Sequence, residues 1–164
     1  MASAHDFSFT TIDNKPLDLK QYAGKPVLLV NVASFCGFTP QYTELQRLHE
    51  TYGPKGLVVL GVPSNDFGAQ EPKSESEIAK FCETSFGVTF PMTSKQKVVG
   101  ANAHGLYQWI SGEAGEAAAP KWNFHKYLID KNGKLADAWP SKVSPTSKEI
   151  TGAVEMTLAA SAGL

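Results

Sequence analysis

Cys36 lies in a stretch of sequence that is typical of a reactive thiol. It follows the mostly apolar run Val27 to Val32, which predicts a strand buried on both faces. Thr39 and Pro40 come next and favour a helix start, with Thr39 as the N-cap and Pro40 as the first helical residue. Cys36 is therefore expected between the carboxyl end of a strand and the amino end of a helix. Open α/β sheets place active sites at that edge, and unpaired helix N–H groups favour a thiolate.

The second cysteine, Cys82, lies in another predicted helix. That helix begins with a capping box formed by Ser74 and Glu77, and the apolar spacing that includes Ile78 places Cys82 on the inward side. A cysteine on the apolar side of a helix is usually a packing residue, so this position alone assigns no redox role. Two cysteines so far apart in sequence indicate free thiols or a transient redox pair rather than a disulfide framework.

The elements around the two cysteines predict a strand–helix–strand unit. A helix is expected from about Pro40 to Tyr52 and a second buried strand over 57–62. Because such a crossover with short connections is right-handed, its two strands should be parallel neighbours. The loop from Pro63 to Pro72 then falls on the same edge of the sheet as Cys36.

The remaining predicted elements are two hairpins and two helices. The turn of the second hairpin contains Asn132-Gly133, the strongest short hairpin signal. The four elements are a hairpin of 7–10 with 16–19, a helix over 102–111, a hairpin of 124–130 with 134–138, and a last helix over 146–160. No internal repeat or second domain is recognisable, so the 164 residues are interpreted as one domain, 1–164.

Composition excludes several classes of function. A formal net charge of −1 gives no electrostatic footprint for nucleic acid. No apolar run approaches the ~20 residues of an integral membrane segment, and the amino end lacks the features of a signal peptide, so a cytoplasmic protein is expected. None of the 4 histidines has a metal-ligand spacing with another histidine or with a cysteine. Neither a metal nor a cofactor is predicted.

Four blocks of the sequence together resemble the glutathione peroxidase family, in particular its cysteine-containing, short-loop, thioredoxin-dependent branch. They are NVASFCGFTPQY, GVPSNDFGAQEP, FC followed by GVTFP, and KWNFHKYLIDKNG. The resemblance runs over nearly the whole chain. It implies an α/β, thioredoxin-like fold with a central mixed β-sheet flanked by helices and an N-terminal β-hairpin. It also implies reduction of hydrogen peroxide and of organic or lipid hydroperoxides to water and alcohols.

The same resemblance implies a set of site residues. Cys36 matches the peroxidatic cysteine, Gln70, Trp122 and Asn123 match the family's glutamine and Trp-Asn pair, and Cys82 matches the resolving cysteine. Uncharged donors of these types can stabilise a thiolate and the charge on a leaving oxygen. The expected products are a sulfenic acid at Cys36 and then a Cys36–Cys82 disulfide, which thioredoxin, or less readily glutathione, would reduce.

Further expectations concern assembly, motion and surface. The linker 111–120 is too short for the segment that family tetramers use, so a monomer is expected. If Cys82 faces inward, the helix over 74–86 must open locally, because a disulfide needs Cα atoms within about 7 Å. Phe38, Trp122 and Phe124 are proposed as an apolar docking apron. Two departures from the family pattern, Asp66 and His125, concern only fine tuning, and His125 is expected at the surface.

Other thiol chemistries fit less well. A peroxiredoxin would have threonine three residues before its cysteine, where this chain has Ala33, and a thioredoxin-type dithiol would have cysteine at the position of Thr39. A peroxide sensor that passes its disulfide to a partner protein would use the same Cys36 and Cys82. The sequence leaves that alternative open.

Overall fold

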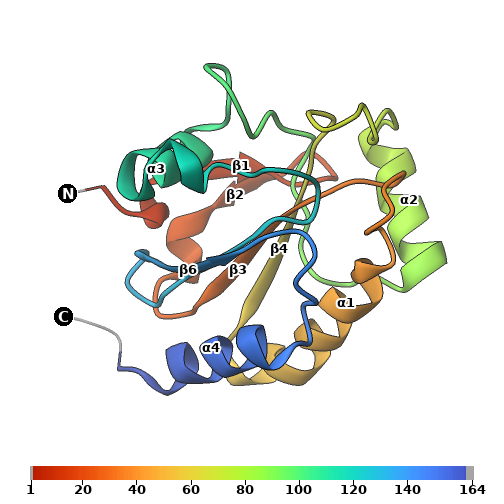
Figure 1. Ribbon diagram of the computed structural model, residues 1–164. Helices are drawn as coiled ribbons and strands as arrows, with labels where there is room; N and C mark the ends of the chain where they lie inside the picture. The colour runs from red at the N-terminus through yellow and green to blue at the C-terminus, as the bar shows by residue number, and fades with distance from the viewer. Residues whose placement is uncertain (1, 162–164) are drawn as a thin grey trace.

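The structure is a computed structural model that describes residues 2–161, and a four-stranded mixed sheet lies at its centre (Figure 1). The strand order is β4-β3-β5-β6. The strands are β3 (Val27–Val32), β4 (Val58–Pro63), β5 (Lys126–Ile129) and β6 (Leu135–Trp139). β3 and β4 are parallel, as predicted, whereas β5 runs antiparallel to both β3 and β6.

The strand that leads to Cys36 is buried on both faces, as its composition predicts. All six residues of β3 are buried. Leu28 and Val30 belong to one hydrophobic core, and Val27 and Leu29 belong to the other. The alternation follows from the two-residue period of a strand. β3 therefore fixes both cores and holds the loop after Val32 at a defined place on the sheet edge.

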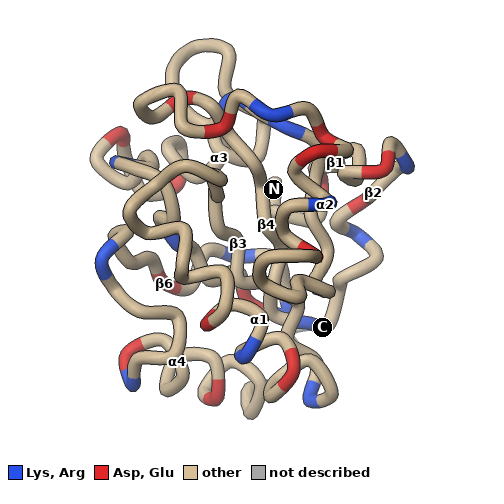
Figure 2. The backbone as a smooth tube through the Cα atoms, turned by 90° about the vertical axis from the view of Figure 1, so that its right-hand side faces the viewer, with Lys and Arg blue, Asp and Glu red and all other residues tan. Residues whose placement is uncertain are grey.

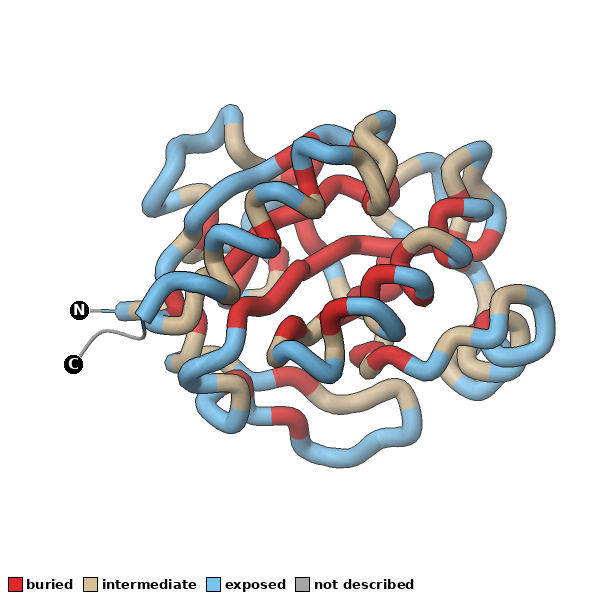
Figure 3. Tube along the Cα trace, turned by 90° about the horizontal axis from the view of Figure 1, so that it is seen from below, coloured by how far each residue is buried: buried red, intermediate tan, exposed pale blue. Residues whose placement is uncertain are grey.

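In the described part of the chain, four α-helices surround the sheet (Figure 1). They are α1 (Gln41–Tyr52), α2 (Glu75–Phe86), α3 (Gly105–Ala114) and α4 (Lys148–Ala159). Residues of α1, α2 and α4 share one core, and residues of α3 join the other. Figure 3 shows the buried residues along the strands and on the inward sides of the helices, with exposed residues around them. The apolar stripe predicted for α1 is confirmed: Tyr42, Leu45, Leu48 and Tyr52 are buried.

Both predicted hairpins are present. β1 (Ser8–Thr10) pairs antiparallel with β2 (Pro16–Asp18), and this hairpin packs on the core of α3. β5 and β6 form the second hairpin, where Gly133 adopts φ +81°, a left-handed conformation that glycine adopts without strain. The short 3-10 helices are Ala4–Asp6, Leu19–Tyr22, Gly53–Lys55 and Glu116–Ala118.

Helix boundaries differ from the prediction where side chains find other partners. Thr39 is not the N-cap of α1; Pro40 occupies that position without a side-chain hydrogen bond, and the Thr39 hydroxyl bonds within the Cys36 loop. α3 begins at Gly105, about three residues later than expected, because the His104 side chain accepts a hydrogen bond from Leu106 N and caps it. The capping box of Ser74 and Glu77 at α2 is confirmed.

Residues 2–161 contain neither a membrane-spanning helix nor a cluster of metal-binding side chains. No helix within residues 2–161 is long and apolar enough to cross a membrane. Within the same residues, no group of three or more His, Cys, Asp or Glu side chains is placed to hold a metal ion.

Candidate active site

Cys36 lies in a tight loop between β3 and α1. Its thiol is half-buried and forms no disulfide. The Thr39 hydroxyl accepts a hydrogen bond from Cys36 N at 2.9 Å and donates one to Ala33 O at 2.8 Å. These bonds fold the loop back on itself. Phe38 N then donates to the Cys36 sulfur at 3.4 Å. The thiol thus has a main-chain N–H donor directed at its sulfur.

Two further loops bring the predicted polar residues together. Asn123 is fully buried, and its Nδ2 donates to Gln70 Oε1 at 2.9 Å and to Phe67 O at 3.4 Å. Because the Gln70 oxygen is occupied in this way, its Nε2 protons remain for another acceptor. Phe35 N donates to Gln70 O at 3.0 Å, which ties the Gln70 loop to the residue before Cys36.

The Trp122 and Gln70 side chains both pack against Gly68. A β-carbon on Gly68 would lie 3.1 Å from Trp122 Cη2 and 3.4 Å from Gln70 Nε2, so a larger side chain there would press on both residues. Gly68 also has φ +65°, where an L side chain is strained. The Phe67 ring lies 5.7 Å from the Trp122 ring. Sequence reasoning did not single out Gly68.

Strained backbone occurs next to both polar residues. Ala69, just before Gln70, has φ +50°, and Phe124, just after Asn123, has φ +65°. Left-handed conformations in non-glycine residues are uncommon and cluster at functional sites. Asn31 of β3 holds the second of these turns, because its Nδ2 donates to Trp122 O at 3.0 Å and its carbonyl accepts from Phe124 N at 2.6 Å.

The indole and amide donors do not reach the sulfur in this structure. Within the described part of the chain, the hydrogen bond to Cys36 Sγ comes from Phe38 N, and neither Gln70 Nε2 nor Trp122 Nε1 donates to that atom. The structure thus brings Gln70, Trp122 and Asn123 into one cluster, tied by main chain to the Cys36 loop. Their donation to sulfur remains a prediction.

Comparisons with known proteins decide the family. Residues 4–111 match the family model described as glutathione peroxidase. A hydroperoxy fatty acid reductase of Synechocystis sp., gpx1, is 43% identical over 162 residues, which cover 94% of this chain and 95% of that protein. The chain belongs to the glutathione peroxidase family.

Other relatives agree with this assignment. Glutathione peroxidase-like peroxiredoxin 2 of Saccharomyces cerevisiae is 49% identical over 130 residues, covering 77% of this chain and 80% of that protein. The crystal structure of Trgpx in its apo form superposes with a TM-score of 0.80 at 34% identity, covering 99% of this chain and 100% of that one. This family member is therefore a peroxidase that acts on hydroperoxides.

The predicted fold class is confirmed as well. A thiol:disulfide interchange protein of the thioredoxin family from Chlorobium tepidum has a TM-score of 0.67 at 18% identity, covering 96% of this chain and 97% of that one. At that identity the likeness concerns the fold alone. The mixed sheet flanked by helices and the N-terminal hairpin are the other predicted features of this thioredoxin-like fold.

The peroxidase's second cysteine is enclosed in α2. Cys82 is 1% exposed and unbonded, and burial raises the pKa of its thiol to about 11. The fully buried Tyr42 hydroxyl faces this thiol without a hydrogen bond of normal geometry. The inward orientation predicted for Cys82 is confirmed, and the structure contains no disulfide between Cys36 and Cys82.

A buried carboxylate near the Cys36 loop was missed by sequence reasoning. Glu71 is fully buried, and its Oε2 accepts a 3.0 Å hydrogen bond from the Ser34 hydroxyl. Burial raises the pKa of Glu71, while the Ser34 bond and the positive charges of Lys95 and Lys73 oppose that rise. In the sequence, Glu71 was marked only by its position next to Gln70.

The structure corrects the predictions for His125 and Phe124. His125 is 7% exposed rather than a surface residue, and its Nδ1 accepts a 3.4 Å hydrogen bond from Lys121 N. Burial lowers the pKa of its imidazole to about 4, so the ring is neutral near pH 7. Phe124 is fully buried and cannot belong to a docking apron, because its left-handed backbone turns the ring inward against Tyr42.

The two other residues of the predicted apron are not fully buried, and Phe35, next to Cys36 in the chain, adds an exposed ring. Phe35 is 56% exposed and Trp122 is 36% exposed, whereas Phe38 is half-buried.

Asp66, the other departure from the family pattern, is structural: its Oδ2 accepts hydrogen bonds from Val98 N at 2.7 Å and Val99 N at 3.3 Å. Figure 2 shows acidic and basic residues interspersed over the loops and helices around the sheet.

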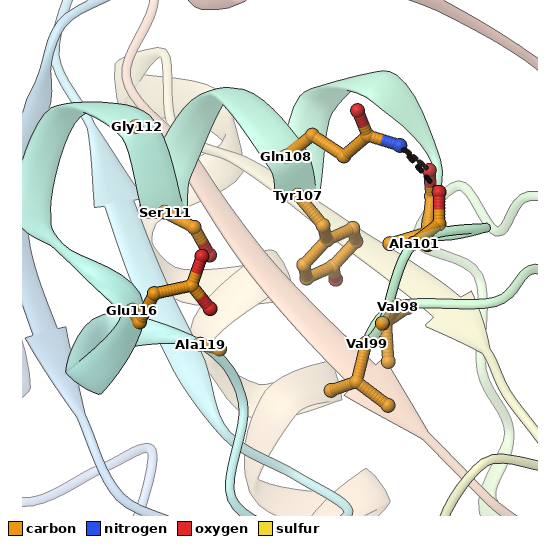
Figure 4. A pocket seen from close by; sticks show the side chains of 11 residues that line it. Val98, Val99, Ala101, Tyr107, Gln108, Ser111, Gly112, Glu116 and Ala119 are labelled. Atoms are coloured by element: carbon orange, nitrogen blue, oxygen red, sulfur yellow. Dashed lines mark hydrogen bonds between the residues drawn. The ribbon is translucent and has the colours of Figure 1, made fainter.

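A cavity of about 470 Å³ lies beside α3, apart from the cysteine loop (Figure 4). Val98, Val99, Tyr107, Ser111 and Glu116 are among the residues that line it. None of the predicted site residues does.

Proposed function

We propose that Cys36 is the peroxidatic residue of this peroxidase. Its thiolate attacks the terminal oxygen of a hydroperoxide, the O–O bond breaks, and the departing oxygen takes a proton to become water or an alcohol. Cys36 keeps the transferred oxygen as a sulfenic acid. The observation that carries this assignment is the convergence of the Gln70, Trp122 and Asn123 cluster on the loop that presents the thiol.

The hydrogen-bond donors of the site are assigned to two different atoms, the Cys36 sulfur and the leaving oxygen. Phe38 N already faces the sulfur and is assigned to it. Gln70 Nε2 and Trp122 Nε1, which are not bonded to sulfur, are assigned to the oxygen that develops negative charge as the O–O bond breaks. Asn123 does not touch the substrate in this scheme. It orients Gln70 by occupying its carbonyl oxygen.

Cys82 is assigned the resolving role. The Cys82 thiol loses its proton, its thiolate attacks the Cys36 sulfenic sulfur, and an S–S bond forms as the S–O bond breaks. The departing hydroxyl takes up that proton and leaves as water. In the closed fold Cys82 is enclosed and its raised pKa keeps it a thiol, so α2 must open before this step. Only Ile78 and Cys82 are buried on α2, so the helix has few anchors to lose.

Thioredoxin is proposed as the reductant. A low-potential dithiol reduces such a disulfide by exchange through a mixed disulfide. The name of the yeast relative, a glutathione peroxidase-like peroxiredoxin, supports a protein thiol donor. The exposed rings of Phe35, next to Cys36, and of Trp122, at the Gln70 cluster, suit a hydroperoxide with an apolar chain, consistent with the hydroperoxy fatty acid reductase among the relatives. We further propose a monomeric, single-domain, cytoplasmic enzyme.

A coupled assay tests the function. Peroxide consumption is followed with thioredoxin and with glutathione in parallel, for the parent, Cys36→Ser and Cys82→Ser. We expect sustained turnover with thioredoxin, none with Cys36→Ser, and one oxidation without thioredoxin-linked turnover for Cys82→Ser. Faster turnover with glutathione than with thioredoxin would overturn the proposed donor. A single oxidation of the parent followed by transfer to another protein would indicate a sensor instead.

A further inference from the structure

One lysine links the two cysteine-bearing segments. The Lys73 ammonium lies 5.1 Å from the centre of the Phe35 ring and 4.1 Å from the centre of the Phe81 ring. Phe35 immediately precedes Cys36, and Phe81 immediately precedes Cys82. A cation within about 6 Å of a ring centre is attracted by the ring's negative face. Lys73 therefore joins the loop of one cysteine to the helix of the other.

The position of Lys73 makes this contact informative. Lys73 comes just before Ser74, the N-cap of α2, and is half-buried. A positive charge at the amino end of a helix is disfavoured by the helix dipole. The two rings and the nearby carboxylates of Glu71 and Glu77 offset this, since Lys73 lowers the pKa of both acids.

Few side chains of the helix that Lys73 joins are fully buried. Ile78 and Cys82 are its buried residues, and Phe81 and Phe86 are only half-buried. At its carboxyl end Gly87 takes φ +61° and caps the helix without adding a side chain to the core. The Lys73 contact adds to these anchors at the amino end of α2 and ties the helix to the Cys36 loop.

We propose that Lys73 is a positioning residue that latches α2 to the Cys36 loop and so sets the rate at which Cys82 is released for disulfide formation. The proposal rests on the proposed function, in which Cys82 resolves the Cys36 sulfenic acid. Lys73 itself exchanges neither a proton nor an electron in that step. It acts only on the equilibrium between closed and open α2.

A competing role predicts the opposite sign. Lys73 lies close enough to Cys82 for its positive charge to lower the pKa of that thiol. If this were its main effect, removing the charge would leave less Cys82 thiolate and slow disulfide formation. If the latch is the main effect, removing the charge opens α2 more often and accelerates it.

The test measures both steps in the full-length protein. Tryptophan fluorescence after rapid mixing with hydrogen peroxide separates a peroxide-dependent phase, the oxidation of Cys36, from a peroxide-independent phase, its resolution. The variants are Lys73→Gln, which removes the charge, Lys73→Arg, which keeps a cation over the rings, and Lys80→Gln, a control at an exposed lysine of the same helix. Amide exchange across 75–86 reports opening of α2 directly.

We expect Lys73→Gln to accelerate the second phase and the exchange of α2 about fivefold, the change expected for loss of a cation–π contact. The first phase should change less than about twofold, and Lys73→Arg and Lys80→Gln should resemble the parent. A second phase in Lys73→Gln that is unchanged or slower overturns the latch. If Cys82→Ser still shows the second phase, the resolving role of Cys82 fails instead.

Discussion

Asn123 Nδ2 donates a 2.9 Å hydrogen bond to Gln70 Oε1, which joins two loops separated by 53 residues in the sequence. The bond determines which end of the Gln70 amide is free to donate. Because Asn123 is fully buried, this orientation is protected from competition by water.

Replacement of Asn123 tests this orientation. Asn123→Ala should slow oxidation of Cys36 by about 10- to 100-fold, because Gln70 is then free to rotate. Asn123→Asp should be slower still, since a carboxylate cannot donate to Gln70 Oε1 and its charge opposes a thiolate nearby. The measurement is the second-order rate constant with hydrogen peroxide. Equal rates for the parent and both variants would contradict the assigned role.

Gly68 offers a test of the contact between Trp122 and Gln70. Gly68→Ala should destabilise the fold by about 1–2 kcal/mol through its left-handed backbone and should also displace Trp122. The matched control is Gly24→Ala, which has φ +84° but no atom within 4 Å of the added carbon. Denaturant unfolding should show similar losses of stability for both, whereas the peroxide rate should fall only for Gly68→Ala. A normal rate in Gly68→Ala would show that the contact is dispensable.

The enclosure of Cys82 predicts an order of chemical modification. At pH 8 iodoacetamide should alkylate Cys36 in the native reduced protein well before Cys82, whose raised pKa of about 11 and burial leave it a protected thiol. Mass spectrometry of digested samples gives the two rates. In mild denaturant, which favours opening of α2, the difference should narrow. Equally fast alkylation of both thiols in the folded protein would show that Cys82 is accessible without opening.

Lys126 predicts a dependence of stability on pH. Its ammonium is fully buried, donates to Phe124 O at 2.7 Å and Ser141 O at 2.9 Å, and has a pKa lowered by burial to about 7. Between pH 7 and the ordinary value of 10.5 the unfolded chain binds more protons at this residue than the folded one, so its contribution to stability rises with pH. Lys126→Met should remove this rise in the unfolding free energy.

Cys82 contributes with the opposite sign and provides a control. Its pKa is raised from 9.0 to about 11, so the folded state binds more protons there and its contribution is lost as pH rises through that window. Cys82→Ala should therefore remove a fall in the unfolding free energy with rising pH, whereas Lys126→Met should remove a rise. Urea unfolding at a series of pH values measures both. Parallel curves for the parent and Lys126→Met would show that Lys126 titrates normally.

Much of the fold could be predicted because its signals are local. The apolar run of β3, the capping box of α2 and the Asn-Gly turn each depend on a few neighbouring residues. The role of Thr39 was predicted wrongly for the complementary reason. Its hydroxyl can cap a helix or bond within a loop, and only the positions of Ala33 and Cys36 decide between them.

The candidate site was predictable through a family resemblance more than through residue patterns. Cys36 was recognisable by its place after a buried strand, but Gln70 and Asn123 become a pair only when two loops meet. Glu71 and Asn31 were missed, although an asparagine inside an otherwise apolar strand was a usable signal, because a buried amide must find partners. Those partners lie about ninety residues away, beyond the reach of any local rule.

The position of Asn31 in β3 makes the site sensitive to insertions and deletions in that strand. β3 leads directly to the cysteine loop, and its Asn31 also holds the backbone on either side of Asn123. Pairing of Val30 with Lys126 fixes the register between the two segments. One residue added or deleted within β3 would exchange its two faces. A chain that refolded around such a change would keep the same side chains, but the Cys36 thiol would be displaced relative to the amides of Gln70 and Asn123.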